Sequence, residues 1–181
     1  AVTARLLHLK VGRVERSWHR NCLAAGLAQG FLEPLEATAL HIVLVTVDGF
    51  LDAWDGNRRD AFNAAIARRY DGIRDYIVCH YRAALRDDSD YWRDATGHDY
   101  LSDSLKGIFT AWFTGGDLEE EIARQGIGDI YPALSWHCLL AGYGNFPDRL
   151  VPPGEDIAEI DMAEVERFVA GCASNFPTHL E

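Results

Sequence analysis

The sequence predicts a mainly α-helical fold that begins with a few short strands. An almost unbroken apolar run over residues 40–54 is long enough for a helix, and apolar residues recur at helical spacing through most of the chain that follows. Strand-like alternation is confined to the residues before Gly26. Because a few strands are poorly stable without a sheet to complete them, we expect the rest of that sheet to lie in a missing N-terminal region or in another chain.

Short segments at the N-terminus carry the strand prediction. Residues 4–11 alternate in apolar character and predict a strand, Gly12 predicts a turn, and residues 14–17 predict a segment that pairs back. The short apolar run of residues 21–25 predicts a buried strand that ends at Gly26.

The apolar run of residues 40–54 predicts a buried helix, because its side chains are apolar on every side of a helix. The run is too short, and too interrupted by Asp48 and Gly49, to cross a membrane. Pro34 suits the first helical position, since its missing N–H would be unpaired there in any case. We therefore expect Glu36 in the first turn of this helix.

The start of this helix has unusual chemistry. The backbone N–H groups of Thr38 and Ala39 lie at or near the unpaired helix end, which carries partial positive charge and suits an anion. A buried Glu36 carboxylate beside an anion site is costly unless it is used. The alternative is an ordinary capping box, in which a glutamate of the first turn only caps the helix.

Later segments are expected to be helical. A long amphipathic helix starts at Asn57 or Asp60, and Ser102 caps another helix that ends at Gly115. Asp161 caps the last helix. The expected buried stripe of the last helix contains Met162, Val165, Phe168 and Cys172.

Charge and cysteine content narrow the function classes. A formal net charge of −11 argues against nucleic-acid and anionic-membrane partners. The sequence has no signal peptide and no transmembrane run, so we expect a cytoplasmic protein. Cys22, Cys79, Cys138 and Cys172 form no C-x-x-C pair, and we expect buried free thiols and no metal site.

One stretch of the chain resembles a known family signature. Residues 18–38 read WHRNCLAAGLAQGFLEPLEAT, which is similar to the W-x-x-N-x-x-A-x-G-L-x-x-G-F-x-E-P-L-E-S-T pattern of flavin-dependent tryptophan halogenases. Further matches are IRDYI at residues 73–77, SDSL at 102–105, AGYG at 141–144 and FPTH at 176–179. The resemblance therefore extends over essentially the whole chain.

The resemblance implies an enzyme that chlorinates or brominates an electron-rich aromatic substrate, of tryptophan or indole type, through a flavin hydroperoxide and hypohalous acid. A separate flavin reductase would supply reduced FAD, and a homodimer of the full-length enzyme is an option. By its place in the motif, Glu36 is the implied catalytic residue, which acts as a general base or stabilises the cationic ring. The implied halide-binding amides are those of Thr38 and Ala39, and the implied cofactor-facing residues are Gly26, Pro34 and Leu35.

The resemblance also implies a substrate pocket with aromatic walls in the region after residue 130. Aromatic walls suit a flat, electron-rich ring. By alignment with the family, Tyr131 and Trp136 are the implied wall residues. The alternative, that both side chains only pack in the core, stays open.

The chain departs from the family pattern both within the signature and in motifs that it lacks. Ala37 stands where the family has serine, and Ala39 where it often has glycine, which narrows the backbone conformations available. The sequence also contains no G-x-G-x-x-G loop for the FAD pyrophosphate. Neither Lys10 nor Lys106 lies in a motif that matches the family's catalytic lysine.

These departures predict the division of the chain. We expect residues 1–35 to be a remnant of an FAD-binding α/β domain that is otherwise absent, and residues 36–181 to form a helical substrate-binding module. We expect this chain alone to be inactive. Two other functions stay open, a flavin-dependent aromatic monooxygenase and a non-catalytic helical module that binds a partner protein.

Overall fold

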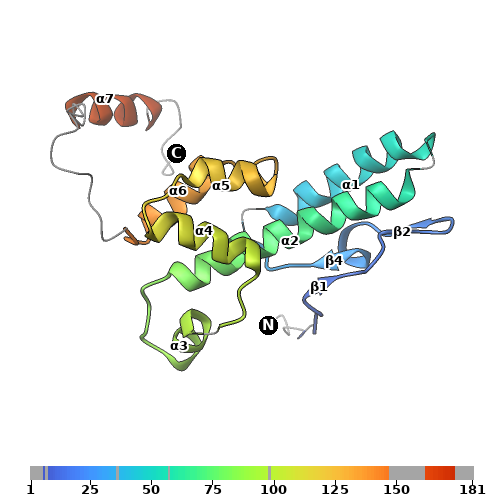
Figure 1. The fold of residues 1–181 in the computed structure, drawn as a ribbon, viewed down its shortest axis with the longest axis horizontal. Coiled ribbons are helices and arrows are strands. Elements are labelled where there is room, and N and C mark those ends of the chain that lie inside the picture. The colour runs from blue at the N-terminus through green and yellow to red at the C-terminus, as the bar shows by residue number, and fades with distance from the viewer. Residues whose placement is uncertain are drawn as a thin grey trace, which may run out of the picture. The chain divides into compact units, whose positions relative to one another are not determined.

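A computed structural model describes residues 6, 8–35, 37–56, 58–97, 99–146 and 162–173. The chain divides into two units, Ala1–Asp148 and Arg149–Glu181, and each is described by itself. The described part of the first unit is mainly helical, as the sequence predicts, with four two-residue strands ahead of the helices (Figure 1).

The strands form two small antiparallel pairs. In one pair, β1 (Gly12–Arg13) lies beside β4 (Gly30–Phe31), and in the other, β2 (Trp18–His19) lies beside β3 (Cys22–Leu23). The few expected strands are therefore present, but their predicted bounds were wrong. Residues 8–11 form no strand, and residues 21–25 contribute only the half-exposed β3.

Residues 14–17 form no strand, and no pairing between them and the described residues 8–11 is present. The backbone N–H of Val14 instead donates to the carbonyl oxygen of Gln29, at 2.8 Å. Gln29 follows a single 3₁₀ turn, η1 (Gly26–Ala28), and leads directly into β4. The strand alternation predicted a local hairpin, but the backbone N–H of Val14 bonds to Gln29, which is 15 residues further along the chain.

Helices α1 (Thr38–Trp54) and α2 (Arg59–Ala83) lie side by side and form the long arm of the first unit (Figure 1). The predicted start of α1 was wrong, because the helix begins at Thr38 and Pro34 lies ahead of it. Its N-cap is Ala37, which adopts a left-handed backbone with φ 53° and ψ 22°. A residue with a side chain is strained in that region, so the turn into α1 is tightly constrained.

The prediction that α1 is buried on all sides was also wrong. Its buried residues are Thr38, Ile42, Thr46 and Ala53. A second row of large apolar side chains, at spacings of four and three residues, is 42–71% exposed: Leu40, Leu44, Val47, Leu51 and Trp54. The helix packs on α2 and η1 through one face only, so the described residues leave the opposite face open.

Helix α2 connects two hydrophobic cores. The first core lies between α2 and the helices α4 (Asp103–Phe113), α5 (Leu118–Gln125) and α6 (Ala133–Gly142), with the short α3 (Asp90–Gly97) following α2 (Figure 1). The second core joins α2 to α1 and to Trp18 of β2. One long helix therefore fixes the N-terminal strands and the later helices relative to each other.

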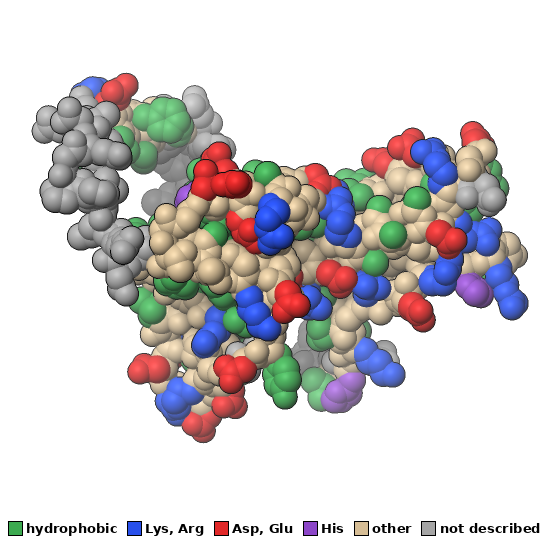
Figure 2. Space-filling model, in the orientation of Figure 1, with side chains coloured by type: hydrophobic (Ala, Val, Ile, Leu, Met, Phe, Trp, Pro, Cys, Tyr) green, Lys and Arg blue, Asp and Glu red, His purple; other side chains and the backbone are tan. Residues whose placement is uncertain are grey.

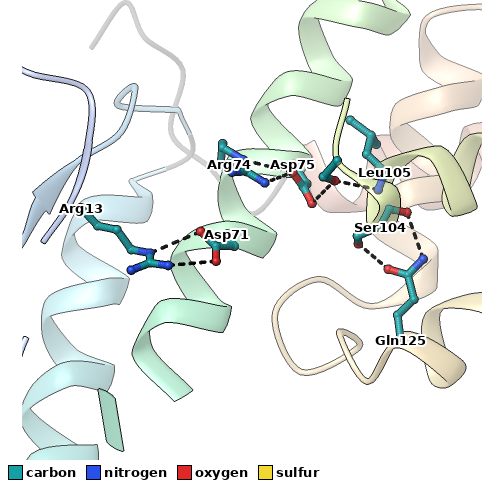
Figure 3. Close-up of polar contacts among 8 residues, drawn as sticks. Arg13, Asp71, Arg74, Asp75, Ser104, Leu105 and Gln125 are labelled. Atoms are coloured by element: carbon teal, nitrogen blue, oxygen red, sulfur yellow. Dashed lines mark hydrogen bonds and ion pairs between the residues drawn. The ribbon is translucent and has the colours of Figure 1, made fainter. Parts of the chain in front are cut away.

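Polar contacts on α2 reinforce this arrangement (Figure 3). Asp71 accepts two hydrogen bonds from the guanidinium of Arg13, at 3.3 and 3.1 Å. Asp75, which is 4% exposed, accepts from the Ser102 hydroxyl at 2.6 Å. Ser102 also caps α4 by accepting from the Leu105 N–H at 3.0 Å, which confirms the predicted cap.

The surface carries charges of both signs. On the face seen in Figure 2, basic and acidic side chains are interspersed and do not gather in one basic patch. No helix among the described residues is both long and apolar enough to span a bilayer. In the second unit, the described residues form α7 (Met162–Ala173). The expected cap Asp161 lies outside the described residues, and the side chains of the expected buried stripe, Met162, Val165, Phe168 and Cys172, are exposed.

The four cysteines are free thiols, as the sequence predicts. The expectation that all four are buried was wrong. Cys79 is buried in the first core, whereas Cys22, Cys138 and Cys172 are exposed. Apolar neighbours in sequence did not determine burial, because each exposed cysteine falls on the outer face of its element.

Candidate active site at the start of α1

An apolar cavity of about 160 Å³ lies where the signature segment meets α1 and α2. Its wall includes three of the predicted site residues, Gly26, Thr38 and Ala39. Tyr70 of α2 also lines this cavity, and its ring lies close to Gly30. The other two predicted cofactor-facing residues are not on this wall: Pro34 is exposed, and Leu35 packs against the second core.

Glu36 lies outside the described residues. The residues around it define the helix start. The Thr38 hydroxyl and the Thr38 N–H, the latter at 3.3 Å, both donate to the carbonyl oxygen of Leu35. Of the two predicted halide-binding amides, that of Thr38 is therefore engaged within the protein, whereas that of Ala39 lies in the first turn of α1.

The capping-box alternative does not fit this helix start. A capping box needs a hydroxyl side chain at the N-cap and Glu or Gln three residues later. Here the N-cap is Ala37, which makes no side-chain cap hydrogen bond, and the residue three positions later is Leu40. Glu36 precedes the cap, so its place in the sequence is not explained by capping.

A second carboxylate lies at the cavity wall. Glu33 lines the cavity, and its Oε1 accepts a hydrogen bond from the hydroxyl of Tyr81 on α2. Burial and the neighbouring Glu33 carboxylate raise the pKa of the Tyr81 hydroxyl. The sequence analysis did not select Glu33, although the first glutamate of the E-P-L-E motif was a signal that could have identified it.

A second cavity, of about 210 Å³, shares Thr38 with the first. Its other lining residues are His41 of α1, Ile73 of α2, and Ile130 and Tyr131 from the loop before α6. The predicted pocket residue Tyr131 therefore lies at one cavity with the predicted halide-binding residue Thr38. Thr38 is therefore the lining residue that the two cavities have in common.

Trp136 does not line either cavity. It is 1% exposed in the first core, and its ring meets Tyr76 edge-on with centroids 4.9 Å apart. Tyr76 in turn stacks on Tyr131, with centroids 3.7 Å apart and planes at 13°. Trp136 therefore fits the alternative in which it only packs in the core. The stacked ring of Tyr76 holds the ring plane of Tyr131 in place.

A buried amide holds the signature segment against both long helices. Gln29 is fully buried, and its Nε2 donates to Ser17 Oγ and Thr46 Oγ1, each at 3.0 Å. Its Oε1 accepts from Thr46 Oγ1 at 3.1 Å and from the Tyr70 hydroxyl at 3.3 Å. The sequence analysis missed this residue, because glutamine in a turn usually indicates a solvent-exposed position.

The first cavity is mostly apolar, and none of the described residues that line it carries a basic side chain, so it fits an apolar group better than a phosphate. Gly26 has φ +59°, and a Cβ on Gly30 would lie 2.7 Å from the Gly12 carbonyl oxygen and 2.9 Å from the Tyr70 ring. Within the described ranges, no group of three or more His, Cys, Asp or Glu side chains could hold a metal ion.

Comparison with known proteins gives the family. The sequence matches the family model described as tryptophan halogenase over residues 1–159. The 7-chloro-L-tryptophan 6-halogenase KtzR of Kutzneria sp. (strain 744) is 34% identical, over 99% of this chain and 36% of KtzR. Tryptophan 6-halogenase SttH of Streptomyces toxytricini is 31% identical, over 92% of this chain and 32% of SttH. The chain thus spans about a third of the length of these curated relatives.

Solved structures agree. A thermophilic tryptophan halogenase, Th-Hal, from Streptomycin violaceusniger matches with a TM-score of 0.70 at 31% identity, over 93% of this chain and 33% of that chain. BrvH, a flavin-dependent halogenase from Brevundimonas sp. BAL3, matches with a TM-score of 0.65 at 28% identity, over 92% of this chain and 33% of that chain. Since the family model covers well over half of the sequence, the chain belongs to the tryptophan halogenase family.

Proposed function

We propose that this chain is part of a flavin-dependent halogenase that chlorinates or brominates an electron-rich aromatic substrate of tryptophan or indole type. The observation that carries the proposal is the pair of cavities that meet at Thr38. One cavity is lined largely by the family signature, and the other is lined by Tyr131, two isoleucines and His41 beside Thr38. This pairing supports a reaction in which the halogen is activated beside one cavity and meets its acceptor ring in the other.

Reduced FAD, when bound, supplies with oxygen the oxidising equivalents that turn halide into hypohalous acid. In this chain, Gly26, Gly30 and Tyr70 would hold an edge of its ring system in the first cavity. The N–H of Ala39 would hold the halide at the start of α1, where the helix end favours negative charge. We also propose that a separate flavin reductase supplies the reduced FAD and that the protein is located in the cytoplasm.

Glu36 acts on the substrate in this proposal. A ring carbon takes the halogen from hypohalous acid as the oxygen–halogen bond breaks, and the oxygen leaves as water after protonation. The ring becomes a cation whose charge the Glu36 carboxylate stabilises. The proton on the halogenated carbon then passes to that carboxylate, which restores the aromatic ring.

Replacement of Glu36 tests this role. The assay uses the natural protein that carries this chain, with whatever sequence flanks it, together with reduced FAD, oxygen and bromide. Loss of a positioned general base lowers rates by about 10²–10⁴-fold, so Glu36→Gln should lower the bromination rate by at least ~10². Glu119→Gln, an exposed residue of α5, is the matched control and should keep the wild-type rate. Bromination by Glu36→Gln at near wild-type rate would contradict the assignment.

One observation favours a second candidate, a flavin-dependent aromatic monooxygenase. The Thr38 N–H is engaged by the Leu35 carbonyl, and Ala37 and Ala39 replace the family's serine and glycine. A weakened halide site would divert the same oxidising chemistry to hydroxylation. A hydroxylated product that forms at the same rate with and without bromide would favour this candidate.

We further propose that the 181-residue chain alone performs neither halogenation nor hydroxylation.

A further inference from the structure

A groove runs between α1 and α2, which lie side by side (Figure 1). Its volume is about 330 Å³, which falls in the range of roughly 300–1,000 Å³ that small-molecule pockets occupy. None of the described residues that line this groove also lines either of the two cavities that meet at Thr38. The proposed function therefore leaves the groove unused.

Small side chains on both helices give the groove its shape. Each helix contributes a pair of lining residues four positions apart, and therefore on one face: Gly49 and Ala53 of α1, and Ala61 and Ala65 of α2. The lining residues of α2 extend from Arg58 to Arg69. Eleven residues of helix cover roughly 16 Å, so the groove is elongated along the helices. This shape suits a linear molecule better than a bulky ring system.

The floor of the groove is apolar. Phe62 and Ile66 line it, and both are buried residues of the second core. Ala61 and Ala65, one turn of helix apart, are exposed and form the rim. A linear ligand would therefore cover an apolar floor with its chain, and each CH₂ group that is fully buried tightens binding about fourfold.

One end of the groove carries surplus positive charge. Arg68 donates to both carboxylate oxygens of Asp129, at 2.9 and 2.8 Å, and Arg69 donates to one of them at 3.1 Å. The hydrogen bond from Arg68 lowers the pKa of the Asp129 carboxyl, so two cations share one ionised carboxylate. At the other end, the charges of Arg58 and Asp52 balance.

This surplus contrasts with the formal net charge of −11 of the whole chain. The Arg68 side chain is 45% exposed, so its guanidinium is within reach of a ligand in the groove. A guanidinium has five N–H donors and forms strong hydrogen bonds with a carboxylate. The charge at this end therefore favours an anionic head group on the linear ligand.

We propose that the groove between α1 and α2 binds a linear aliphatic carboxylate, of the medium-chain fatty acid class. The carboxylate accepts hydrogen bonds from Arg68, and the chain lies over Phe62 and Ile66 toward Arg58. This binding site is separate from the proposed site of halogenation. The inference therefore does not depend on the proposed function, and each can fail without the other.

A chain-length series tests the apolar floor. Hexanoate, octanoate and decanoate are titrated by calorimetry into the natural protein that carries this chain. Because the groove is open on one side, we expect affinity to rise at least about twofold per added CH₂, half the effect of full burial. Ala65→Leu fills the groove and should weaken octanoate binding at least ~10-fold. Ala64→Leu, the same change at an exposed neighbour that does not line the groove, should leave it unchanged.

A change of head group tests the charged end. Octanoate should bind at least ~10-fold more tightly than octylamine, since a hydrogen bond to a charged group has about this effect. Arg68→Gln should remove this difference and keep the dependence on chain length, which shows that the groove is still formed. Arg68→Lys keeps the positive charge and should preserve most of the difference.

The wild-type measurements decide the inference even if a variant fails to fold. Affinity that does not rise with chain length, or equal binding of octanoate and octylamine, overturns it. Equal effects of Ala65→Leu and Ala64→Leu would place the acid elsewhere and overturn it as well. A groove that flanking sequence, a second copy or a partner helix already covers would bind no acid, with the same consequence.

Discussion

At the scale of the residue, Gln29 has the clearest structural role. Its amide satisfies three buried hydroxyls, from the N-terminal segment, α1 and α2. Gln29→Leu leaves these hydroxyls without their partner, and an unsatisfied buried polar group costs about 1–3 kcal/mol. We expect urea unfolding of this variant to show a loss of that size. Leu27→Ala, an exposed residue of the same turn, should stay within ~0.5 kcal/mol of wild type, and equal losses would contradict the role of Gln29.

Cys79 differs from the other cysteines in its environment. Burial raises the pKa of its thiol from 9.0 to about 12, because the thiolate would be desolvated. The folded state therefore binds this proton more tightly than the unfolded state. The stability from this group is fully present below pH 9.0 and is lost as the pH rises toward 12.

Alkylation at pH 8 checks this difference. Iodoacetamide should modify Cys22, Cys138 and Cys172, which are exposed, and leave Cys79 unmodified until the chain is unfolded. Peptide mass spectrometry gives the modified fraction at each cysteine. Modification of Cys79 in the folded protein at the rate of Cys138 would contradict its burial.

The residues of the site were only partly predictable. The signature identified Gly26, Thr38 and Ala39, which do line one cavity. It could not identify His41, whose partner Arg69 is 28 residues away along the chain. The E-P-L-E motif could have identified Glu33, but not its contact with Tyr81, 48 residues away, which forms only when α2 packs on the N-terminal segment.

At the scale of the element, α1 separates what the sequence can and cannot predict. Its length and apolar character predicted a helix, and the helix is confirmed. The predicted start of α1 was too early because Ala37 adopts a left-handed backbone just before the helix. Alanine at that position gives no sign of such a backbone, whereas glycine would have done so. Its burial was overestimated because a run apolar on all sides does not reveal which face has a packing partner.

Gly30 allows β4 to lie close to the backbone of Gly12 and to the ring of Tyr70. A Cβ at Gly30 would lie 2.7 Å from a backbone oxygen, which cannot rotate away as a side chain would. We expect Gly30→Ala to lower the free energy of unfolding by about 1–3 kcal/mol, the usual cost of overpacking. Gly142→Ala meets no atom within 4 Å and is the matched control. Thermal unfolding of both variants gives the comparison, and an unchanged Gly30→Ala would contradict the close approach.

At the scale of the whole molecule, α2 explains why a short stretch of signature and a distant loop form one site. Its first half packs on α1 and β2, and its second half packs on the later helices. Sequence periodicity predicted most of the helices, because each has its own apolar stripe. The relation between them could not be predicted, because it depends on contacts between residues far apart in sequence.

Family membership and the two cavities that share Thr38 support our proposal that this chain contributes to enzymatic halogenation of an aromatic ring. The most direct measurement is mass analysis of indole incubated with the natural protein, reduced FAD, oxygen and bromide. We expect a product with the paired isotope peaks of one bromine, which disappears when bromide is omitted. A product that carries only oxygen, or no product from an enzyme shown to be folded and flavin-bound, would contradict it.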